Sequence, residues 1–306
     1  MLEDPLVSLV IPTLNSGKTV RKTLESIKNL DYTNFEIIVV DGNSTDDTLD
    51  IVREYSSSYP LRVVVEEKKG RGPAYNRGII ESKGKYVAFL DSDAMIATPG
   101  WIRRAINIMQ NDDKIAVVFT KVYSPPDSSL MQKSIDTFLC KGYTTANGAI
   151  YRRDIVEKVG MFNDRMNYMQ EDELLFKLTK EGYKFAVNYN DKIYHYHRNT
   201  FTAYIKQNAE AAKGAKDYAK FVGNRKFLFV SELRVASFII SIGILIALLL
   251  FSPLLVPILI AISYLALVLK VNKETCSIYR NSKYVILAPF MIYLSLAGFT
   301  VGFLTT

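Results

Sequence analysis

The sequence predicts an α/β domain built on a mostly parallel sheet, followed by helices that cross a membrane. Three observations predict this architecture. Apolar strands alternate with amphipathic helices, polar residues follow the ends of several strands, and the C-terminal part contains two long uncharged apolar runs. Such alternation is typical of parallel α/β sheets, in which ligands bind at the carboxyl ends of the strands. A chain of 306 residues suffices for one large domain or two modest ones.

The elements of the first third of the chain follow from local patterns. Short runs of β-branched and apolar residues predict strands at 6–14, 35–41, 61–67 and 86–90. Helical spacing of apolar residues predicts helices at 18–30 and 46–57. A third helix is expected after the glycine-rich turn at Gly70, and another near Trp101.

The pattern becomes looser after residue 113. We expect a strand at 114–123, an irregular segment at 124–145, and a strand that leads into a short helix within 146–162. A helix at 171–181 and one more strand complete the predicted domain, which spans residues 1–200.

Two apolar runs near the C-terminus predict membrane spans. Residues 235–269 and 284–306 carry no charge, and a spanning helix needs about 20 residues. The first run is too long for one span and is interrupted by Pro253 and Pro257. We therefore expect three spans within a region covering 235–306, at 235–252, 253–269 and 284–304. One long kinked helix is the weaker alternative for the first run.

Charges near these runs predict the orientation of the chain. The loop at 270–283 carries Lys270, Lys273, Arg280 and Lys283 against one acid, Glu274. The positive-inside rule places this loop and the N-terminal domain in the cytoplasm, on a multi-pass protein of the cell membrane. No signal peptide is predicted, and the two cysteines, Cys140 and Cys276, do not indicate a disulfide framework.

The segment 201–234 holds much of the net charge of +7. Its basic residues, mixed with Ala, Phe and Val, are Lys206, Lys213, Lys216, Lys220, Arg225, Lys226 and Arg234. Because a membrane span follows directly, an amphipathic helix against anionic membrane lipid is the favoured interpretation. A solvated helix face is the alternative. No nucleic acid is expected as a partner, since no recognisable binding module accompanies the charge.

Asp91 and Asp93 follow a strand that reads as buried on both faces, in the stretch "VAFLDSDAM". Isolated charges are costly to bury, so two acids at a strand end indicate a positive partner. A divalent cation, Mg²⁺ or Mn²⁺, fits this need, because it binds oxygen ligands from protein carboxylates and from substrate phosphates at the same time. A capped turn before the helix near Trp101 is the alternative.

Other polar residues accompany this pair. Asp41 ends the second strand, where it can accept hydrogen bonds from a nucleotide, or it can form an Asx-turn. Around the glycine-rich turn, three side chains are expected to face a diphosphate: Arg71, Asn76 and Arg77. For Arg71, a solvated position is the alternative.

The last candidates follow in two short groups. Glu171 and Asp172 begin a helix, where the helix dipole stabilises acids and where a general base can also lie. His195 and His197 are expected on one face of a strand, beside Arg198, as metal ligands and a phosphate clamp.

Five segments together resemble family 2 inverting glycosyltransferases, which have the GT-A (Rossmann-like) fold. The segments are "SLVIPTLNSGKTVRKTLESI", "FEIIVVDGNSTDDT", "GRGPAYNRGIIESKGKYVAFLDSDA", "ANGAIYRRDIVEKVGMF" and "QEDELLFKLTKEGY". They come in the family's order and cover roughly residues 5–200. The section "HYHRNTFTAYIKQNAEAAKGAKDYAKF", with membrane spans after it, is similar to the succinoglycan-type subgroup.

The resemblance implies roles for individual residues. Pro12, Thr13 and Asp41 would contact the nucleotide, with UDP as the default. Asp91 and Asp93 would form the D-x-D motif, with Asp93 as the clearer metal ligand, and Asp172 would be the catalytic base. The acceptor or phosphate side would include Asn147, Gly148, Glu171 and Arg198.

The predicted activity is metal-dependent transfer of a sugar from a nucleoside diphosphate to a hydroxyl of a lipid-linked glycan. A polyprenyl-phosphate sugar synthase is the first alternative, and a nucleotide-sugar-binding scaffold without turnover is the second. The chain departs from the family pattern in two ways. The Q-x-x-R-W motif of processive synthases is absent, and Tyr75 replaces an arginine that often precedes Asn76.

Overall fold

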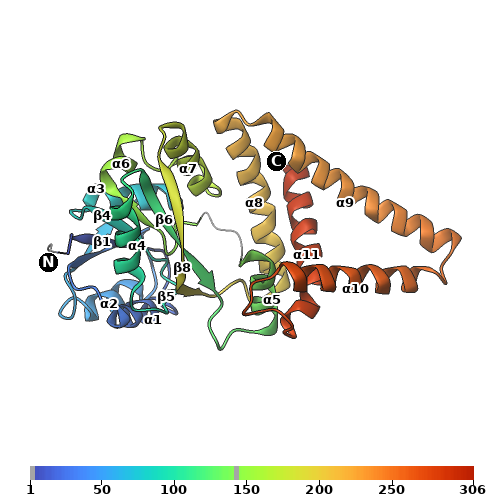
Figure 1. The fold of residues 1–306 in the computed structure, drawn as a ribbon, viewed down its shortest axis with the longest axis horizontal. Coiled ribbons are helices and arrows are strands. Elements are labelled where there is room, and N and C mark those ends of the chain that lie inside the picture. The colour runs from blue at the N-terminus through green and yellow to red at the C-terminus, as the bar shows by residue number, and fades with distance from the viewer. Residues whose placement is uncertain (1–3, 141–144) are drawn as a thin grey trace. The chain divides into compact units, whose positions relative to one another are not determined.

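The computed structural model describes residues 4–140 and 145–306, which belong to two compact units (Figure 1). The first, here called the sheet unit, comprises Met1–Pro125 and Tyr143–Tyr196. The second, the helical unit, comprises Pro126–Gly142 and His197–Thr306. The predicted α/β fold with apolar C-terminal helices is confirmed.

The sheet unit is built on eight strands in the order β3-β2-β1-β4-β7-β6-β8-β5. They are β1 (Val7–Thr13), β2 (Phe35–Asp41), β3 (Leu61–Val65), β4 (Tyr86–Phe89), β5 (Ala94–Ile96), β6 (Ile115–Tyr123), β7 (Ile150–Arg152) and β8 (Lys184–His195). The first four in this order are parallel, whereas β7 runs antiparallel to both of its neighbours, β4 and β6. β5 was not predicted, because three residues are too few to show a period.

Helices cover both faces of this sheet (Figure 1). They are α1 (Val20–Ser26), the 3₁₀ turn η1 (Ile27–Asn29), α2 (Thr48–Glu54), α3 (Arg71–Glu81), α4 (Trp101–Asn111), α6 (Arg153–Lys158) and α7 (Gln170–Lys180). Leu9 and Val10, adjacent in β1, are fully buried in the two different cores. Successive strand residues point to opposite faces, so a strand buried on both faces needs an unbroken apolar run.

The helical unit contains α5 (Leu130–Leu139), α8 (Phe201–Val222), α9 (Arg225–Phe251), α10 (Val256–Glu274) and α11 (Tyr284–Thr305). Among the described residues, three helices are long and apolar enough to cross a membrane: α9, α10 and α11. α9 ends before Pro253, so the apolar run 235–269 forms two helices rather than one kinked helix. α9 begins at Arg225, and the expected boundary at residue 234 therefore lies inside a continuous helix.

The expectation of an irregular segment at 124–145 is wrong for its central part. Ser129 and Gln132 form a capping box that begins α5, and Met131 and Ile135 pack against Met291 of α11. Because the apolar partner of α5 lies far away in the sequence, local patterns alone do not predict this helix. Residues 141–144 of that expected segment lie outside the described residues.

A disulfide joins Cys140 to Cys276, contrary to the expectation from the sequence. Cys140 follows α5 and Cys276 follows α10, and their Cα atoms are 6.1 Å apart. The two residues are separated by 136 positions, so only the packing of α5 against α10 and α11 brings them together.

Candidate active site

The site lies at the carboxyl ends of β1, β2 and β4. In the parallel register, Thr13 at the end of β1 is opposite Asp41 at the end of β2. β4 pairs with the other side of β1 and leads directly into Asp91. The hydroxyls of Ser16 and Ser92 lie 2.7 Å apart and join the loop after β1 to the middle of the D-S-D stretch. Three loops that are distant in the sequence therefore form one edge.

Asp41 is almost fully buried, with 1% of its surface exposed. Its carboxylate accepts hydrogen bonds from Thr13 Oγ1 at 3.1 Å, and from Ser44 N and Oγ at 2.9 and 2.6 Å. The carboxylate of Asp41 therefore bonds to the backbone three residues on and fixes the turn after β2. The same bonds hold Thr13 and the partly buried Pro12 at the edge where a nucleotide would bind.

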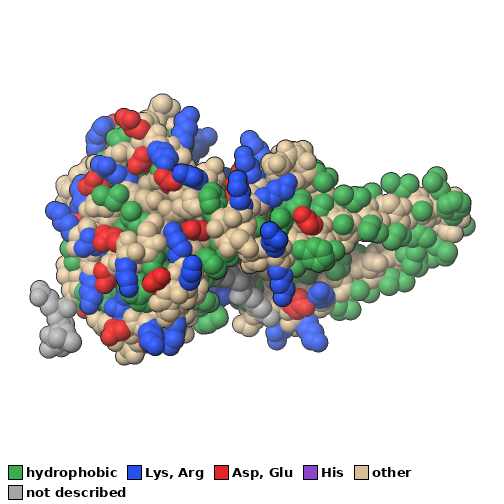
Figure 2. Space-filling view, turned by 90° about the horizontal axis from the view of Figure 1, so that it is seen from above, with side chains coloured by type: hydrophobic (Ala, Val, Ile, Leu, Met, Phe, Trp, Pro, Cys, Tyr) green, Lys and Arg blue, Asp and Glu red, His purple; other side chains and the backbone are tan. Residues whose placement is uncertain are grey.

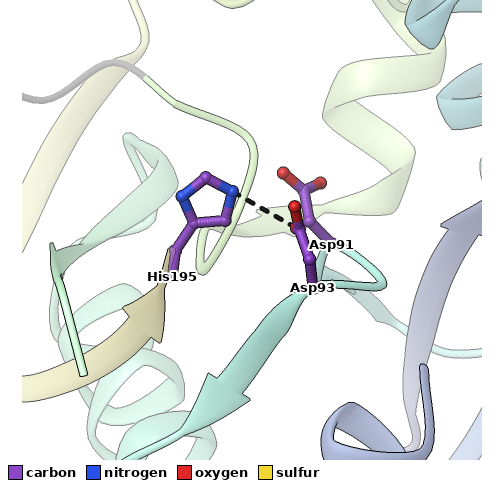
Figure 3. Close-up of side chains that lie close together, drawn as sticks. All are labelled: Asp91, Asp93 and His195. Atoms are coloured by element: carbon purple, nitrogen blue, oxygen red, sulfur yellow. Dashed lines mark ion pairs between the residues drawn. The ribbon is translucent and has the colours of Figure 1, made fainter. Parts of the chain in front are cut away.

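Asp91, Asp93 and His195 form an acidic cluster with one histidine (Figure 3). Each offers one ligand atom, and these atoms lie within 4.8 Å of one another. His195 Nε2 is 3.2 Å from Asp93 Oδ1. The short strand β5 explains this contact, because its antiparallel register with β8 places Ala94 opposite His195. Two carboxylates and an imidazole suit Mg²⁺ or, better, Mn²⁺, so the residues fit the predicted metal.

The electrostatics of the cluster favour a positive partner. Burial raises the pKa of Asp91, and the charge of Asp93 adds to this effect. Burial also acts on Asp93, but the hydrogen bond and charge of His195 outweigh it and lower the pKa of Asp93. Burial disfavours the charged form of His195, whereas its bond to Asp93 raises its pKa more strongly. The folded protein therefore concentrates negative charge beside one imidazole.

Arg71 and Tyr75 lie one turn apart on α3 and belong to the same environment. Tyr75 is buried, and its hydroxyl donates to Asp91 Oδ1 at 3.4 Å. Burial acts to lower the pKa of Arg71, but the charges of Tyr75, Asp91 and Glu171 raise it overall. Arg71 is thus a permanent cation near the acids. Tyr75 was noticed in the sequence only as a substitution, although its i, i+4 spacing from Arg71 indicates a shared face.

The structure gives Asn76 and Arg77 other partners than a diphosphate. The Asn76 side chain donates to Phe162 O at 2.9 Å and accepts from Phe162 N at 3.0 Å. Arg77 forms an ion pair with Glu81, one turn further along α3, at 2.8 Å. The amide of Asn76 is therefore used to fix the loop before α7, and the donor contact expected of Asn76 is corrected accordingly. The donor contact expected of Arg77 stays a prediction.

Glu171 and Asp172 begin α7 but differ in environment. Glu171 is buried and accepts a hydrogen bond from Ala146 N at 3.3 Å, whereas Asp172 is partly exposed. Burial raises the pKa of Glu171 to about 7. Adjacent helical residues point about 100° apart, which explains the difference. Of the two acids, Asp172 is the one open to a substrate.

Glu171→Gln is expected to stabilise the protein in mildly alkaline solution. The unfolded chain releases the Glu171 proton near the ordinary pKa of 4.5, and the folded chain near 7. Stability should therefore fall as the pH rises between these values, by up to about 3 kcal/mol in total. A glutamine side chain stays neutral at every pH, so the variant does not lose this stability as the pH rises. The measurement compares the melting temperatures of the wild type and the variant in detergent, at about pH 5 and about pH 8. The same difference between the two proteins at both pH values would contradict the assignment.

Asn147 and Gly148 hold the end of β4 in the structure. The buried Asn147 accepts from Asp91 N at 3.1 Å, and Gly148 N donates to Phe89 O at 2.8 Å. Gly148 has a positive φ of 80°, and an added Cβ would lie 2.8 Å from Ile193 Cγ1. These two residues, expected on the acceptor side, hold the end of β4 and the start of the D-x-D stretch in position.

His197 and Arg198 belong to the helical unit, not to the cluster around Asp93. β8 ends at His195, so the expectation that both histidines share one strand face is wrong. His197 Nε2 lies 2.7 Å from Asp136 Oδ1, and Asp136 also accepts a hydrogen bond from Tyr279. The prediction that His197 is a metal ligand is therefore wrong, because its ring contacts Asp136 of α5 instead. Arg198 is exposed.

Comparisons with known proteins agree with this geometry. The sequence model of the family described as "Glycosyl transferase family 2" matches residues 8–167. Glycosyltransferase AglE of Haloferax volcanii is 28% identical over 192 residues, which are 58% of this chain and 63% of that protein. The chain thus spans less than two thirds of this relative.

Two further proteins are similar over more of their length. One is the dolichyl N-acetyl-alpha-D-glucosaminyl phosphate 3-beta-D-2,3-diacetamido-2,3-dideoxy-beta-D-glucuronosyltransferase of Methanococcus voltae. It is 27% identical over 238 residues, 68% of this chain and 73% of that protein. The other is a solved structure, the mannosyltransferase PcManGT from Pyrobaculum calidifontis in complex with GDP-Man and Mn²⁺. It has a TM-score of 0.70 at 18% identity, over 98% of this chain and 88% of that chain.

Proposed function

Because the chain belongs to glycosyl transferase family 2, and is thus a transferase that acts on nucleotide sugars, we propose a more specific activity. In this proposal, the protein is an inverting, metal-dependent enzyme that moves a sugar to a hydroxyl of a lipid-linked glycan. The acidic cluster at the carboxyl edge of the sheet, with Arg71 nearby, is the observation that carries the proposal. Such a cluster and its cation are suited to a nucleoside diphosphate.

The donor is bound by residues of the three loops at this edge. Asp91, Asp93 and His195 would hold Mg²⁺ or Mn²⁺, whose charge would stabilise the diphosphate as it leaves. The solved neighbour that contains GDP-Man and Mn²⁺ supports this assignment. Arg71 adds a second positive charge, and Thr13 and Asp41 would contact the nucleoside. A UDP-sugar is the first donor to test, and GDP-mannose is the second.

Asp172 acts on the other reactant in this proposal. The acceptor hydroxyl attacks the anomeric carbon from the side opposite the diphosphate, and the bond between that carbon and the diphosphate oxygen breaks. Asp172 takes the hydroxyl proton as the new bond forms, which is typically worth 10²–10⁴-fold in rate. Glu171, buried behind it, holds the loop at Ala146 in place. One direct displacement inverts the anomeric configuration.

The acceptor is proposed to be lipid-linked, and the sheet unit to lie in the cytoplasm. The M. voltae relative is named for a dolichyl-linked sugar, which supports the lipid part. The apolar helices α9 and α10 would place the enzyme in the cell membrane, where such an acceptor is found. The basic loop between α10 and α11 supports the orientation.

A donor panel tests this function. Membranes that contain the protein are incubated with a lipid extract and, in turn, each common UDP- and GDP-sugar. We expect one donor to give diphosphate release together with a glycosylated lipid, and EDTA to abolish both. Membranes with Asp50→Asn, a surface variant outside the site, should behave like the wild type. Release without any lipid product, or no release from any donor, would contradict the proposal.

A further inference from the structure

α11 lies directly against α8 and runs parallel to it (Figure 1). The rings of Phe201 and Phe290 meet edge to face with their centres 5.5 Å apart, and Ser295 Oγ donates to Asn208 Oδ1 at 2.6 Å. Further along, the Lys216 ammonium donates to the Phe303 carbonyl. The partners advance in the same direction on both helices, so the contact extends along most of α11.

Two glycines bring these helices into close contact. A Cβ added at Gly298 would lie 2.5 Å from the carbonyl oxygen of Ile205, and one at Gly302 would overlap that of Ala209. Only glycine permits this approach of two backbones. α8 and α11 are therefore one packed pair, and they must share the same depth relative to a membrane.

α8 cannot cross a membrane. Its 22 residues include six charged side chains spread along the helix: Lys206, Glu210, Lys213, Lys216, Asp217 and Lys220. Each Lys or Asp near the bilayer centre costs about 2.5–3.5 kcal/mol. A helix that crosses beside α8 along its length would carry most of these charges into the hydrocarbon. α11 is long enough to span, but its partner prevents this.

The exposed side of α11 suits a membrane surface instead. Its large exposed side chains recur at helical spacing and form one apolar stripe: Ile286, Phe290, Tyr293, Val301 and Leu304. Within this stripe, Phe290 also contacts Phe201 of α8 and Tyr293 contacts Phe238 of α9. The side with Gly298 and Gly302 faces α8, while α5 and α10 cover Met291 and Val285. α11 carries no charged residue, so the polar face is supplied by α8. The α8–α11 pair together has the apolar side and the charged side of an element that lies in the interface plane.

The α9–α10 hairpin differs from this pair. The apolar windows of α9 and α10 are only 6% and 11% buried, against 39% for α11. Figure 2 shows the projecting end of these helices as almost wholly hydrophobic, with Lys and Arg gathered further back. Their exposed side chains can be covered by lipid alone.

We propose that the α9–α10 hairpin alone enters the hydrocarbon and that the α8–α11 pair lies along the membrane surface. The exposed stripe of α11 contacts acyl chains, and the lysines of α8 face headgroups and water. The end of α11 then lies on the same side of the membrane as Phe201 and the sheet unit. The three-span expectation places it on the opposite side.

Sidedness is tested by labelling introduced cysteines with a membrane-impermeant maleimide. Thr305→Cys reports the end of α11, and Glu157→Cys reports the surface of the sheet unit at α6. The wild type gives the background level of labelling, since its two cysteines are joined in a disulfide. We expect both variants to be protected in sealed vesicles of one orientation and to react in the other. Reaction of Thr305→Cys from the side opposite to Glu157→Cys would overturn the proposal.

Cross-linking tests the helix pair independently of sidedness. Asn208→Cys combined with Ser295→Cys should form a disulfide on mild oxidation in native membranes, because these side chains are in contact. Asn208→Cys combined with Tyr293→Cys is the matched control, since Tyr293 lies on the exposed stripe, and it should not cross-link. Failure of the first pair in a protein that reaches normal membrane levels would overturn the shared depth of α8 and α11. Neither measurement depends on enzymatic activity.

Discussion

Asp93→Asn is expected to reduce sugar transfer by at least about a hundredfold and to abolish its stimulation by Mn²⁺ or Mg²⁺. The physical reason is the position of this carboxylate, which lies 3.2 Å from His195 in the proposed cation site. The amide keeps the shape of the side chain but lacks the charge that a cation needs. Fold should be retained, because Asp93 is 40% exposed and lies outside the apolar cores.

The measurement is transfer rate against metal concentration for the wild type and two variants. Asp50→Asn removes a carboxylate from an exposed ion pair with Arg53 and should follow the wild-type curve. Melting temperature and membrane level should match for all three proteins. Full wild-type activity in excess EDTA, or an Asp93→Asn enzyme that still responds to metal, would rule out the assigned site.

Asp172→Asn is expected to lower the turnover number by at least about a hundredfold while donor affinity stays within about twofold. Asp172 is the partly exposed acid at the start of α7, and its neighbour Glu171 points into the protein. A hydroxyl nucleophile must lose its proton in the transition state, and the asparagine amide cannot accept it. The donor lies on the acidic cluster, so its binding should be unaffected.

This variant also distinguishes between two acceptors. A lipid phosphate is already ionised and needs no base, so a polyprenyl-phosphate sugar synthase would lose far less turnover. Glu181→Gln, an exposed acid after the end of α7, is the matched control and should leave both constants unchanged. Turnover that stays near the wild-type value in Asp172→Asn, with equal donor affinity, would favour the phosphate acceptor over the hydroxyl.

Local patterns predicted the sheet well for a physical reason. β1, β2 and β4 are buried on both faces, so each reads as an unbroken apolar run that ends where polar chemistry begins. The same reasoning located Asp41, Asp91 and Asp93, because the carboxyl ends of parallel strands meet at one edge. α9, α10 and α11 were visible as uncharged runs, since a lipid-facing helix tolerates few polar residues.

Long-range packing decided what local patterns left open. Asn76 looked like a donor ligand in the glycine-rich segment, but Phe162 uses both polar groups of its amide. α5 looked irregular, because the apolar residues that hold it come from α11. The pairing of Cys140 with Cys276 follows from the same contacts.

The sequence by itself therefore determined the α/β class, the edge that holds the site and the apolar character of the C-terminal helices, all of which depend on residues close together in the chain. Tertiary structure alone decided which histidine joins the acids, because the three residues of β5 must pair with β8 before His195 can lie beside Asp93. It also decided that α11 has a charged helix as its neighbour. Hydropathy describes one helix at a time, whereas the free energy of entering a membrane depends on everything packed against it.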